Sequence, residues 1–137
     1  GDCEEEISAV AREVTEIKQH GFVTPDELDA AISKADVLIS IGNSFSRSVP
    51  SKIISYLSYG KPVIHFSSQD SDVCNEYLER YPLALSIHEK TSAFEAAEKI
   101  MLFINNSRSV VISYEQVAHA FAENTPDYSA NLIDQRL

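Results

Sequence analysis

Three short apolar segments, alternating with helical patterns, constrain the fold of this chain more than any other feature. They are DVLISIG at 36–42, KPVIHFS at 61–67 and LALSI at 83–87. Helical patterns lie between them, one at 51–59 that ends at Gly60 and one over 71–81. Strands that are apolar throughout and alternate with helices are typical of a parallel sheet covered on both faces. We therefore expect an α/β fold with a doubly wound parallel sheet and helices on both of its faces.

Further elements are expected before and after these strands. Residues 4–14 have the apolar spacing of a helix, and VTEIKQHGFV at 14–23 predicts a short strand with a glycine turn. A helix start is clear at 24–35, where Thr24, Pro25 and Glu27 form the pattern of a capping box. SAFEAAEKIMLFINNS at 92–107 predicts an amphipathic helix, and 113–137 a helical segment that breaks at Thr125-Pro126.

Composition excludes several classes of protein. The 137 residues fit a single domain, and the 21 acidic against 11 basic residues give a net charge of -10, which argues against a nucleic-acid partner. Two cysteines with no Cys/His cluster indicate no metal site and favour free thiols in a reducing, cytoplasmic compartment. The apolar runs are too short for a transmembrane segment, and no signal peptide is recognisable.

The loop after the first apolar segment is the best candidate for a binding site. Doubly wound sheets bind ligands beyond the carboxyl ends of their strands, and a helix N-terminus attracts anions. Residues 42–62 contain three cations, Arg47, Lys52 and Lys61, and no carboxylate. We expect a phosphate-binding site here; the alternative is that Pro50 merely starts a helix and the cations are solvated. The candidate residues are Asn43, Ser44, Arg47, Ser48, Ser51 and Lys52.

Other polar residues are weaker candidates. His65 lies inside an apolar strand, where a buried, hydrogen-bonded histidine is the more common interpretation. Asp72 follows a strand and could hold a ligand or a metal, although capping the next helix is the commoner role. Cys74 fits the core face of that helix. Walker, dinucleotide-binding and GxSxG nucleophile motifs are absent from the sequence.

The stretch HGFVTPDELDAAISKADVLISIGNSFSRSVPSKIISYLSYGKPVI, residues 20–64, carries a family likeness. It resembles the C-terminal, donor-binding domain of GT-B-fold retaining glycosyltransferases of the bacterial cell-surface polysaccharide type. The Pro-Ser-Lys helix start followed by Gly-Lys-Pro is the most specific part, and FAENTPDYSANLI at 121–133 is similar to the C-terminal helices of such enzymes. The resemblance implies a Rossmann-like half of a GT-B fold, in which 1–137 form one truncated domain that binds a nucleotide sugar.

The resemblance also implies roles for individual residues and for partners. Residues 48–52 would meet the diphosphate of the donor, and Gly21, Phe22 and Val23 would lie under the base. The donor is a substrate, and neither a cofactor nor a metal is expected. The acceptor would be a saccharide or a lipid-linked saccharide bound by an N-terminal domain that this sequence lacks. The intact enzyme would act in the cytoplasm or at the inner face of the membrane, and the fragment alone should be inactive.

One departure from the family pattern concerns the ribose contact. Members commonly carry a Glu-x7-Glu pair whose positions fall here on Arg47 and Ser55. Ser55 cannot accept two ribose hydrogen bonds as a carboxylate does. This leaves open a non-catalytic α/β binding module with a degenerate nucleotide site, or a fragment of a GT-B UDP-sugar epimerase. A receiver-like signalling domain is disfavoured, because Gly42-Asn43 stands where a phosphoacceptor aspartate would be expected.

Overall fold

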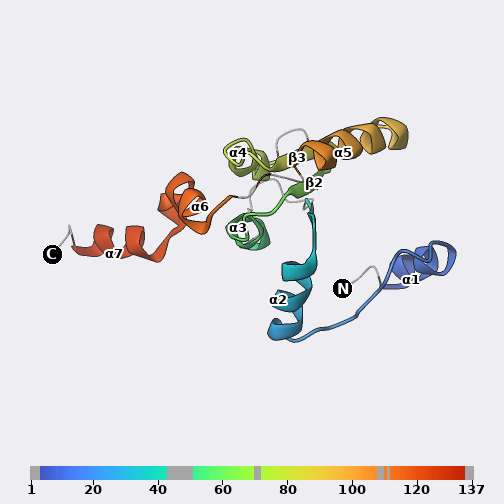
Figure 1. Cartoon of the computed structure of the whole chain (residues 1–137), viewed down its shortest axis with the longest axis horizontal. Helices are drawn as coiled ribbons and strands as arrows, with labels where there is room; N and C mark the ends of the chain where they lie inside the picture. The colour runs from blue at the N-terminus through green and yellow to red at the C-terminus, as the bar shows by residue number, and fades with distance from the viewer. Residues whose placement is uncertain (1–3, 43–50, 70–71, 108–109, 111, 135–137) are drawn as a thin grey trace. The chain divides into compact units, whose positions relative to one another are not determined.

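The structure, a computed structural model, describes residues 4–42, 51–69, 72–107, 110 and 112–134. The chain divides into two compact units, one formed by residues 1–35 and the other by residues 36–137. Each unit has its own elements, which Figure 1 labels along the chain.

The first unit contains two helices and an irregular connection. Helix α1 runs over Glu4–Glu13 and helix α2 over Pro25–Lys34, as expected. The predicted capping box is confirmed, because the Thr24 hydroxyl accepts the Glu27 N–H while the Glu27 carboxylate accepts the Thr24 N–H. The strand predicted over 14–23 is wrong: backbone bonds from Val14 and Ile17 instead continue the end of α1 as turns. A strand needs a neighbour to pair with, and the described residues offer none to this segment.

The second unit is built on a parallel sheet. Its strands are β1 (Leu38–Ile41), β2 (Val63–Ser67) and β3 (Ala84–His88), in the order β1-β2-β3. Leu38 lies opposite Val63 and Ser40 opposite His65, while His65 lies opposite Ser86. The three apolar segments are therefore strands of one parallel sheet, and the expected Rossmann-like α/β fold is confirmed.

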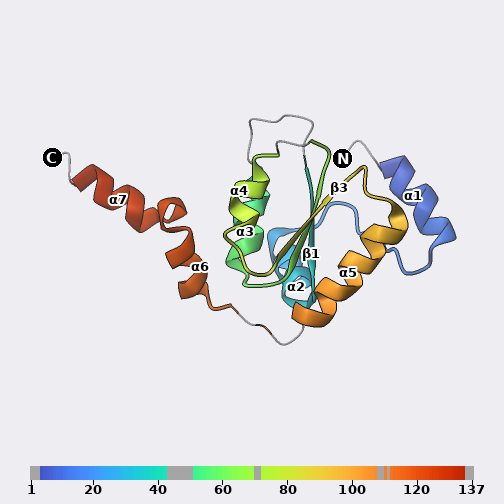
Figure 2. The same ribbon diagram turned by 90° about the horizontal axis from the view of Figure 1, so that it is seen from above.

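Helices cover both faces of this sheet. Helices α3 (Ser51–Ser58) and α4 (Cys74–Leu78) lie on one face, and α5 (Ala93–Ser107) lies on the other (Figure 2). The Ser86 hydroxyl donates to the Asn75 side chain of α4, which identifies the face that also carries Ser40 and His65. Ile53 and Leu57 of α3 are fully buried against this face.

Burial differs between the strands. β2 is covered on both faces, as its apolar sequence predicts, and Val63, Ile64 and His65 are all buried. β1 departs from this expectation, because Ile39 and Ile41 stay 58% and 75% exposed while their neighbours in the strand are buried. Within the described sheet β1 pairs only with β2, so it is an edge strand with one covered face.

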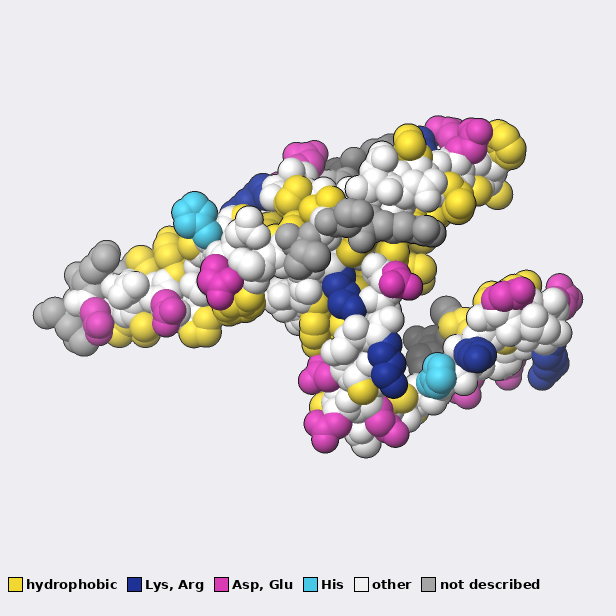
Figure 3. Space-filling view, in the orientation of Figure 1, with side chains coloured by type: hydrophobic (Ala, Val, Ile, Leu, Met, Phe, Trp, Pro, Cys, Tyr) yellow, Lys and Arg dark blue, Asp and Glu magenta, His cyan; other side chains and the backbone are white. Residues whose placement is uncertain are grey.

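The C-terminal segment is helical with the expected break. α6 (Tyr114–Ala120) packs against α3, and a 3-10 turn, η1 (Ala122–Asn124), separates it from α7 (Pro126–Asp134). Phe121 at the break is buried, and the Arg80 guanidinium lies 4.6 Å above its ring. Hydrophobic side chains stay exposed along α7, as Figure 3 shows. Every helix in the described ranges is too short or too polar to span a lipid bilayer.

Candidate functional site

The carboxyl ends of the three strands meet at one edge of the sheet, which we call the carboxyl edge. All three strands are parallel, so β1 ends there at Ile41, β2 at Ser67 and β3 at His88. Open parallel sheets bind their ligands at this edge. The candidate site therefore has to be built from the residues that follow the strands.

The predicted phosphate loop lies only partly within the described residues. Asn43, Ser44, Arg47 and Ser48 lie outside them. Ser51 is the first residue of α3, Lys52 is the second and is exposed, and Ser55 lies exposed one turn further on. The first turn of α3 carries no acidic residue. A helix start with this composition favours negative charge, since its first N–H groups have no partner within the helix.

The third predicted cation lies at the opposite end of the sheet. Lys61 precedes β2, and its carbonyl accepts a 2.9 Å hydrogen bond from the Tyr81 hydroxyl. Lys52 lies in the first turn of α3 and Lys61 lies after the helix, just before β2, so the length of α3 separates the two lysines. The cations counted over residues 42–62 therefore do not form a single cluster, because the helix carries Lys52 and Lys61 to opposite ends.

The residues predicted to lie under the base belong to the first unit. Gly21 has a φ of +66°, and Phe22 is 98% exposed in the irregular connection before α2. Val23 is 43% exposed in the same connection. None of the three is in a strand, so the base contact implied by the resemblance stays a prediction.

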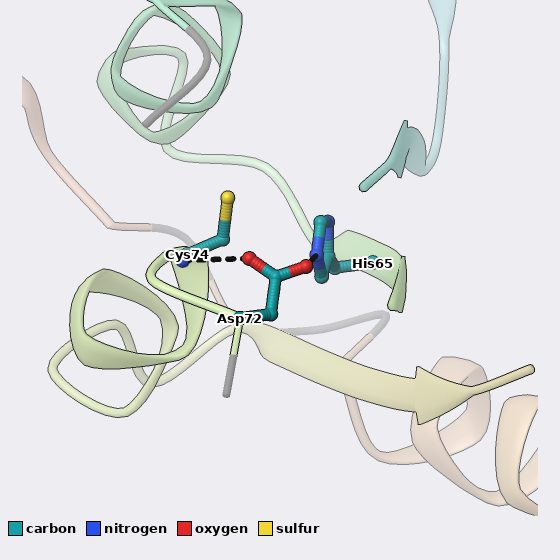
Figure 4. Close-up of side chains that lie close together, drawn as sticks. All are labelled: His65, Asp72 and Cys74. Carbon is teal, nitrogen blue, oxygen red and sulfur yellow. Dashed lines mark hydrogen bonds and ion pairs between the residues drawn. The ribbon is translucent and has the colours of Figure 1, made fainter. Parts of the chain in front are cut away.

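A buried polar cluster lies at the carboxyl edge, formed by Ser40, His65, Asp72 and Cys74. His65 Nε2 lies 3.0 Å from Asp72 Oδ2, and His65 Nδ1 lies 3.2 Å from Ser40 Oγ. The second carboxylate oxygen, Asp72 Oδ1, accepts the Cys74 N–H at 2.9 Å. Figure 4 shows the imidazole of β2 facing the carboxylate, with the thiol beside it at the start of α4.

Burial and hydrogen bonding set the protonation of this cluster. The side chains of His65 and Asp72 are 0% and 7% exposed. Burial opposes ionisation of Asp72, but hydrogen bonds from His65 and from the Cys74 N–H outweigh it and keep the pKa of the carboxyl below its usual value. Burial, followed by the neighbouring Asp72 carboxylate, raises the pKa of the Cys74 thiol to about 12. The cluster therefore combines a carboxylate with a protonated thiol.

Gly42 closes the cluster from the end of β1. Its N–H donates to the Phe66 carbonyl at 2.8 Å, which continues the pairing of β1 with β2. A Cβ atom at Gly42 would lie 2.6 Å from Asp72 Oδ2 and 3.4 Å from His65 Nε2. Only glycine fits beside the pair without a shift, so the β1 backbone can approach both polar atoms closely.

Sequence reasoning recognised these residues separately but missed that they meet. The expectations that His65 is buried and hydrogen-bonded and that Cys74 is a core residue are confirmed. Asp72 is not the N-cap of α4, which is Val73; its carboxylate instead accepts the Cys74 N–H and also reaches His65. One feature of the sequence could have indicated that two of these residues meet. Ser40 is the third residue of β1 and His65 the third residue of β2, so parallel strands paired from their first residues place the two side by side.

Comparisons with models of protein families, with curated proteins and with solved structures found nothing that matches this chain.

A cavity of about 530 Å³ lies near the amino ends of β1 and β2, where Asp36, Val37 and Pro62 line it. It lies at the opposite end of the strands from the carboxyl edge. The start of α3 and the buried cluster are therefore the candidate functional features at the carboxyl edge.

Proposed function

We propose that this chain is the donor-binding part of a glycosyltransferase, which moves a sugar from a nucleoside-diphosphate sugar to a saccharide or lipid-linked acceptor. The observation that carries the proposal is the position of α3. This helix follows β1 at the carboxyl edge of a parallel sheet and opens with Ser51 and Lys52. Helix starts in this position of an α/β sheet bind the phosphates of nucleotides.

Charge around α3 supports an anionic ligand. The chain as a whole has a net charge of -10, so free nucleotides are repelled at long range. Lys52 is exposed and the first turn of α3 contains no carboxylate, so this helix start is a local exception to the acidic character of the chain. Arg47 precedes Lys52 in the sequence by five residues and would add a second positive charge.

In this function the helix start has an electrostatic role. When the sugar leaves, negative charge develops on the departing nucleoside diphosphate. The N–H groups of the first turn and the Lys52 ammonium would stabilise that charge without moving, which is the arrangement that lowers a barrier most effectively. Acceptor binding and the proton transfers of the reaction would fall to residues of the acceptor domain.

A nucleotide titration followed by NMR tests the proposal. We expect UDP, GDP or dTDP at millimolar concentration to shift the amide signals of residues 51–53 in the intact chain. Lys52→Ala should weaken binding by roughly tenfold to a hundredfold, because a charge-assisted hydrogen bond contributes roughly 1.5–3 kcal/mol and each 1.4 kcal/mol is a factor of about ten. Lys34→Ala, which removes a lysine from the last turn of α2, serves as the matched control and should leave the affinity unchanged. Absence of any shift at α3 with all three nucleotides would overturn the proposal.

A substitution at Ser55 distinguishes the transferase hypothesis from the hypothesis of a degenerate binding module. The residue is exposed on α3, one turn inside the helix start, where the family pattern has a glutamate. In the same titration, Ser55→Glu should tighten nucleotide binding if the ribose pocket is otherwise intact. Unchanged affinity in Ser55→Glu would favour a non-catalytic module.

A further inference from the structure

The geometry points to a zinc site at the carboxyl edge, with His65, Asp72 and Cys74 as its three protein ligands. One ligand atom from each of these side chains lies within 4.8 Å of the other two, and all three side chains are buried (Figure 4). Imidazole nitrogen, thiolate sulfur and carboxylate oxygen are the three kinds of ligand that zinc takes in proteins. This inference goes beyond the proposed function and does not depend on it.

The spacing of the ligand atoms is close to what a tetrahedral ion requires. Zinc–ligand bonds of about 2.0–2.3 Å separate neighbouring ligand atoms by roughly 3.3–3.6 Å. His65 Nε2 and Asp72 Oδ2 lie 3.0 Å apart, slightly below this range, so they would separate by a few tenths of an ångström. The Cys74 sulfur lies within 4.8 Å of one ligand atom of each of the other two side chains, so it has to move by roughly 1 Å, which a rotation of its single side-chain torsion supplies.

Two of the three ligands, His65 and Asp72, are already oriented by a contact on their other side. Ser40 Oγ lies at His65 Nδ1, so Nε2 is the ring nitrogen directed at the carboxylate. The Cys74 N–H holds Asp72 Oδ1, which leaves Oδ2 for the ion. Such outer contacts fix the orientation of the ring and the carboxylate in zinc sites, and their loss typically lowers metal affinity by about 10- to 100-fold.

The atoms around Nε2 and Oδ2 support the same conclusion. A carboxylate oxygen can only accept, so its 3.0 Å approach to a ring nitrogen needs either a hydrogen or a cation between them. Gly42 leaves space beside both atoms, because the Cβ that it lacks would stand 2.6 Å from Oδ2. An ion that replaces the hydrogen would use this space.

The ligand set selects the kind of ion. Mg²⁺ and Ca²⁺ take oxygen ligands, so a sulfur and a nitrogen within the same site exclude them. Zinc coordination deprotonates a thiol outright, and a thiolate with a carboxylate would neutralise the two positive charges of the ion. Three protein ligands leave a fourth position for water. The bound ion would connect the middle of β2 with the start of α4.

Metal titration of the intact chain tests this inference. After treatment with a chelator, the protein should bind one Co²⁺ per chain with a thiolate-to-cobalt absorption band, and Zn²⁺ should displace it. Zinc should also raise the melting temperature, because an ion that binds only the folded state stabilises it. Absence of the thiolate band, or a melting temperature that zinc leaves unchanged, would overturn the inference.

Matched variants decide whether this cluster is the site. Cys74→Ser should abolish the cobalt band, whereas Cys3→Ser, at the chain's other cysteine and outside the described residues, should retain it. Ser40→Ala should weaken zinc binding at least tenfold, since it removes only the orienting contact of the ligand His65. His119→Gln, at an exposed histidine of α6, controls for surface binding. Zinc that binds Cys74→Ser as tightly as wild type would contradict the assignment.

Discussion

His65 uses both ring nitrogens at the carboxyl edge, although it lies in the middle of an apolar strand. A buried imidazole needs partners for its polar atoms, and here Ser40 from the neighbouring strand and Asp72 from the segment just before α4 supply them. These partners are 25 and 7 residues away in the sequence. The histidine therefore joins β1, β2 and the start of α4 through hydrogen bonds that an apolar residue could not make.

Tyr81 allows a pH prediction at a single residue. Its side chain is buried, its hydroxyl donates to the Lys61 carbonyl, and burial raises its pKa to about 12. An unfolded tyrosine ionises near pH 10, so between about pH 10 and 12 the folded chain holds a proton that the unfolded chain has lost. Stability should therefore fall as the pH rises through this window.

Spectrophotometric titration of the tyrosines measures this effect. The chain has six tyrosines, and one should ionise late, at about pH 12 or together with unfolding. Tyr81→Phe should remove this late step and cost about 0.5–1.5 kcal/mol at neutral pH through the lost hydrogen bond. Tyr128→Phe, at a tyrosine that is 45% exposed on α7, should leave the late step in place. A late step that persists in Tyr81→Phe would contradict the prediction.

For single residues, the sequence predicts whether a side chain is buried better than it predicts which other side chains it contacts. An apolar strand around His65 and an amphipathic pattern around Cys74 are enough to predict burial, since burial follows local periodicity. The meeting of His65 with Asp72 depends on how the chain returns after β2, and no local pattern encodes that path. The candidate metal cluster could not be predicted for the same reason, because its ligands lack the close spacing of known zinc motifs.

At the scale of elements, local sequence was sufficient to predict an element whose stabilising contacts lie within the element itself. The capping box of α2 is contained within four residues, and it forms as predicted. The strand expected over 14–23 is the contrary case, because a strand depends on a partner and this segment has none among the described residues. Apolar residues in 14–23 allowed a strand to be predicted, but pairing decides the outcome.

The end of α3 provides a prediction about packing between elements. Gly60 follows the helix with a φ of +68°, and a Cβ there would collide with the Ile112 carbonyl from the segment before α6. Gly60→Ala therefore combines an unfavourable left-handed backbone with a clash against main chain. We expect a loss of about 2–4 kcal/mol in the free energy of unfolding, measured by denaturant titration.

Gly21 is the matched control for this change. It has nearly the same conformation, with a φ of +66°, but a Cβ there would meet nothing within 4 Å. Gly21→Ala should thus show the conformational cost alone, roughly 1–2 kcal/mol or less. Equal losses in the two variants would mean that the segment at Ile112 moves aside without cost.

At the scale of the molecule, the sheet has an open edge. Within the described residues β1 pairs only with β2, and its Ile39 and Ile41 are 58% and 75% exposed. Unpaired strand edges with apolar side chains are templates for association with another chain. A net charge of -10 opposes such association through long-range repulsion, most strongly at low salt.

These two effects predict association that depends on salt and on β1. Sedimentation of the wild-type chain should show reversible self-association that strengthens as salt screens the net charge. Ile41→Lys should suppress it, because a charge on the edge strand must be desolvated when a second strand pairs there. Ile133→Lys, at a 63% exposed isoleucine on α7, adds the same charge away from the sheet and should not suppress it, because a positive charge only lowers the net negative charge of the chain. Equal effects of the two lysines would show that net charge controls the association, whereas a larger effect at Ile41 would assign it to the edge of β1.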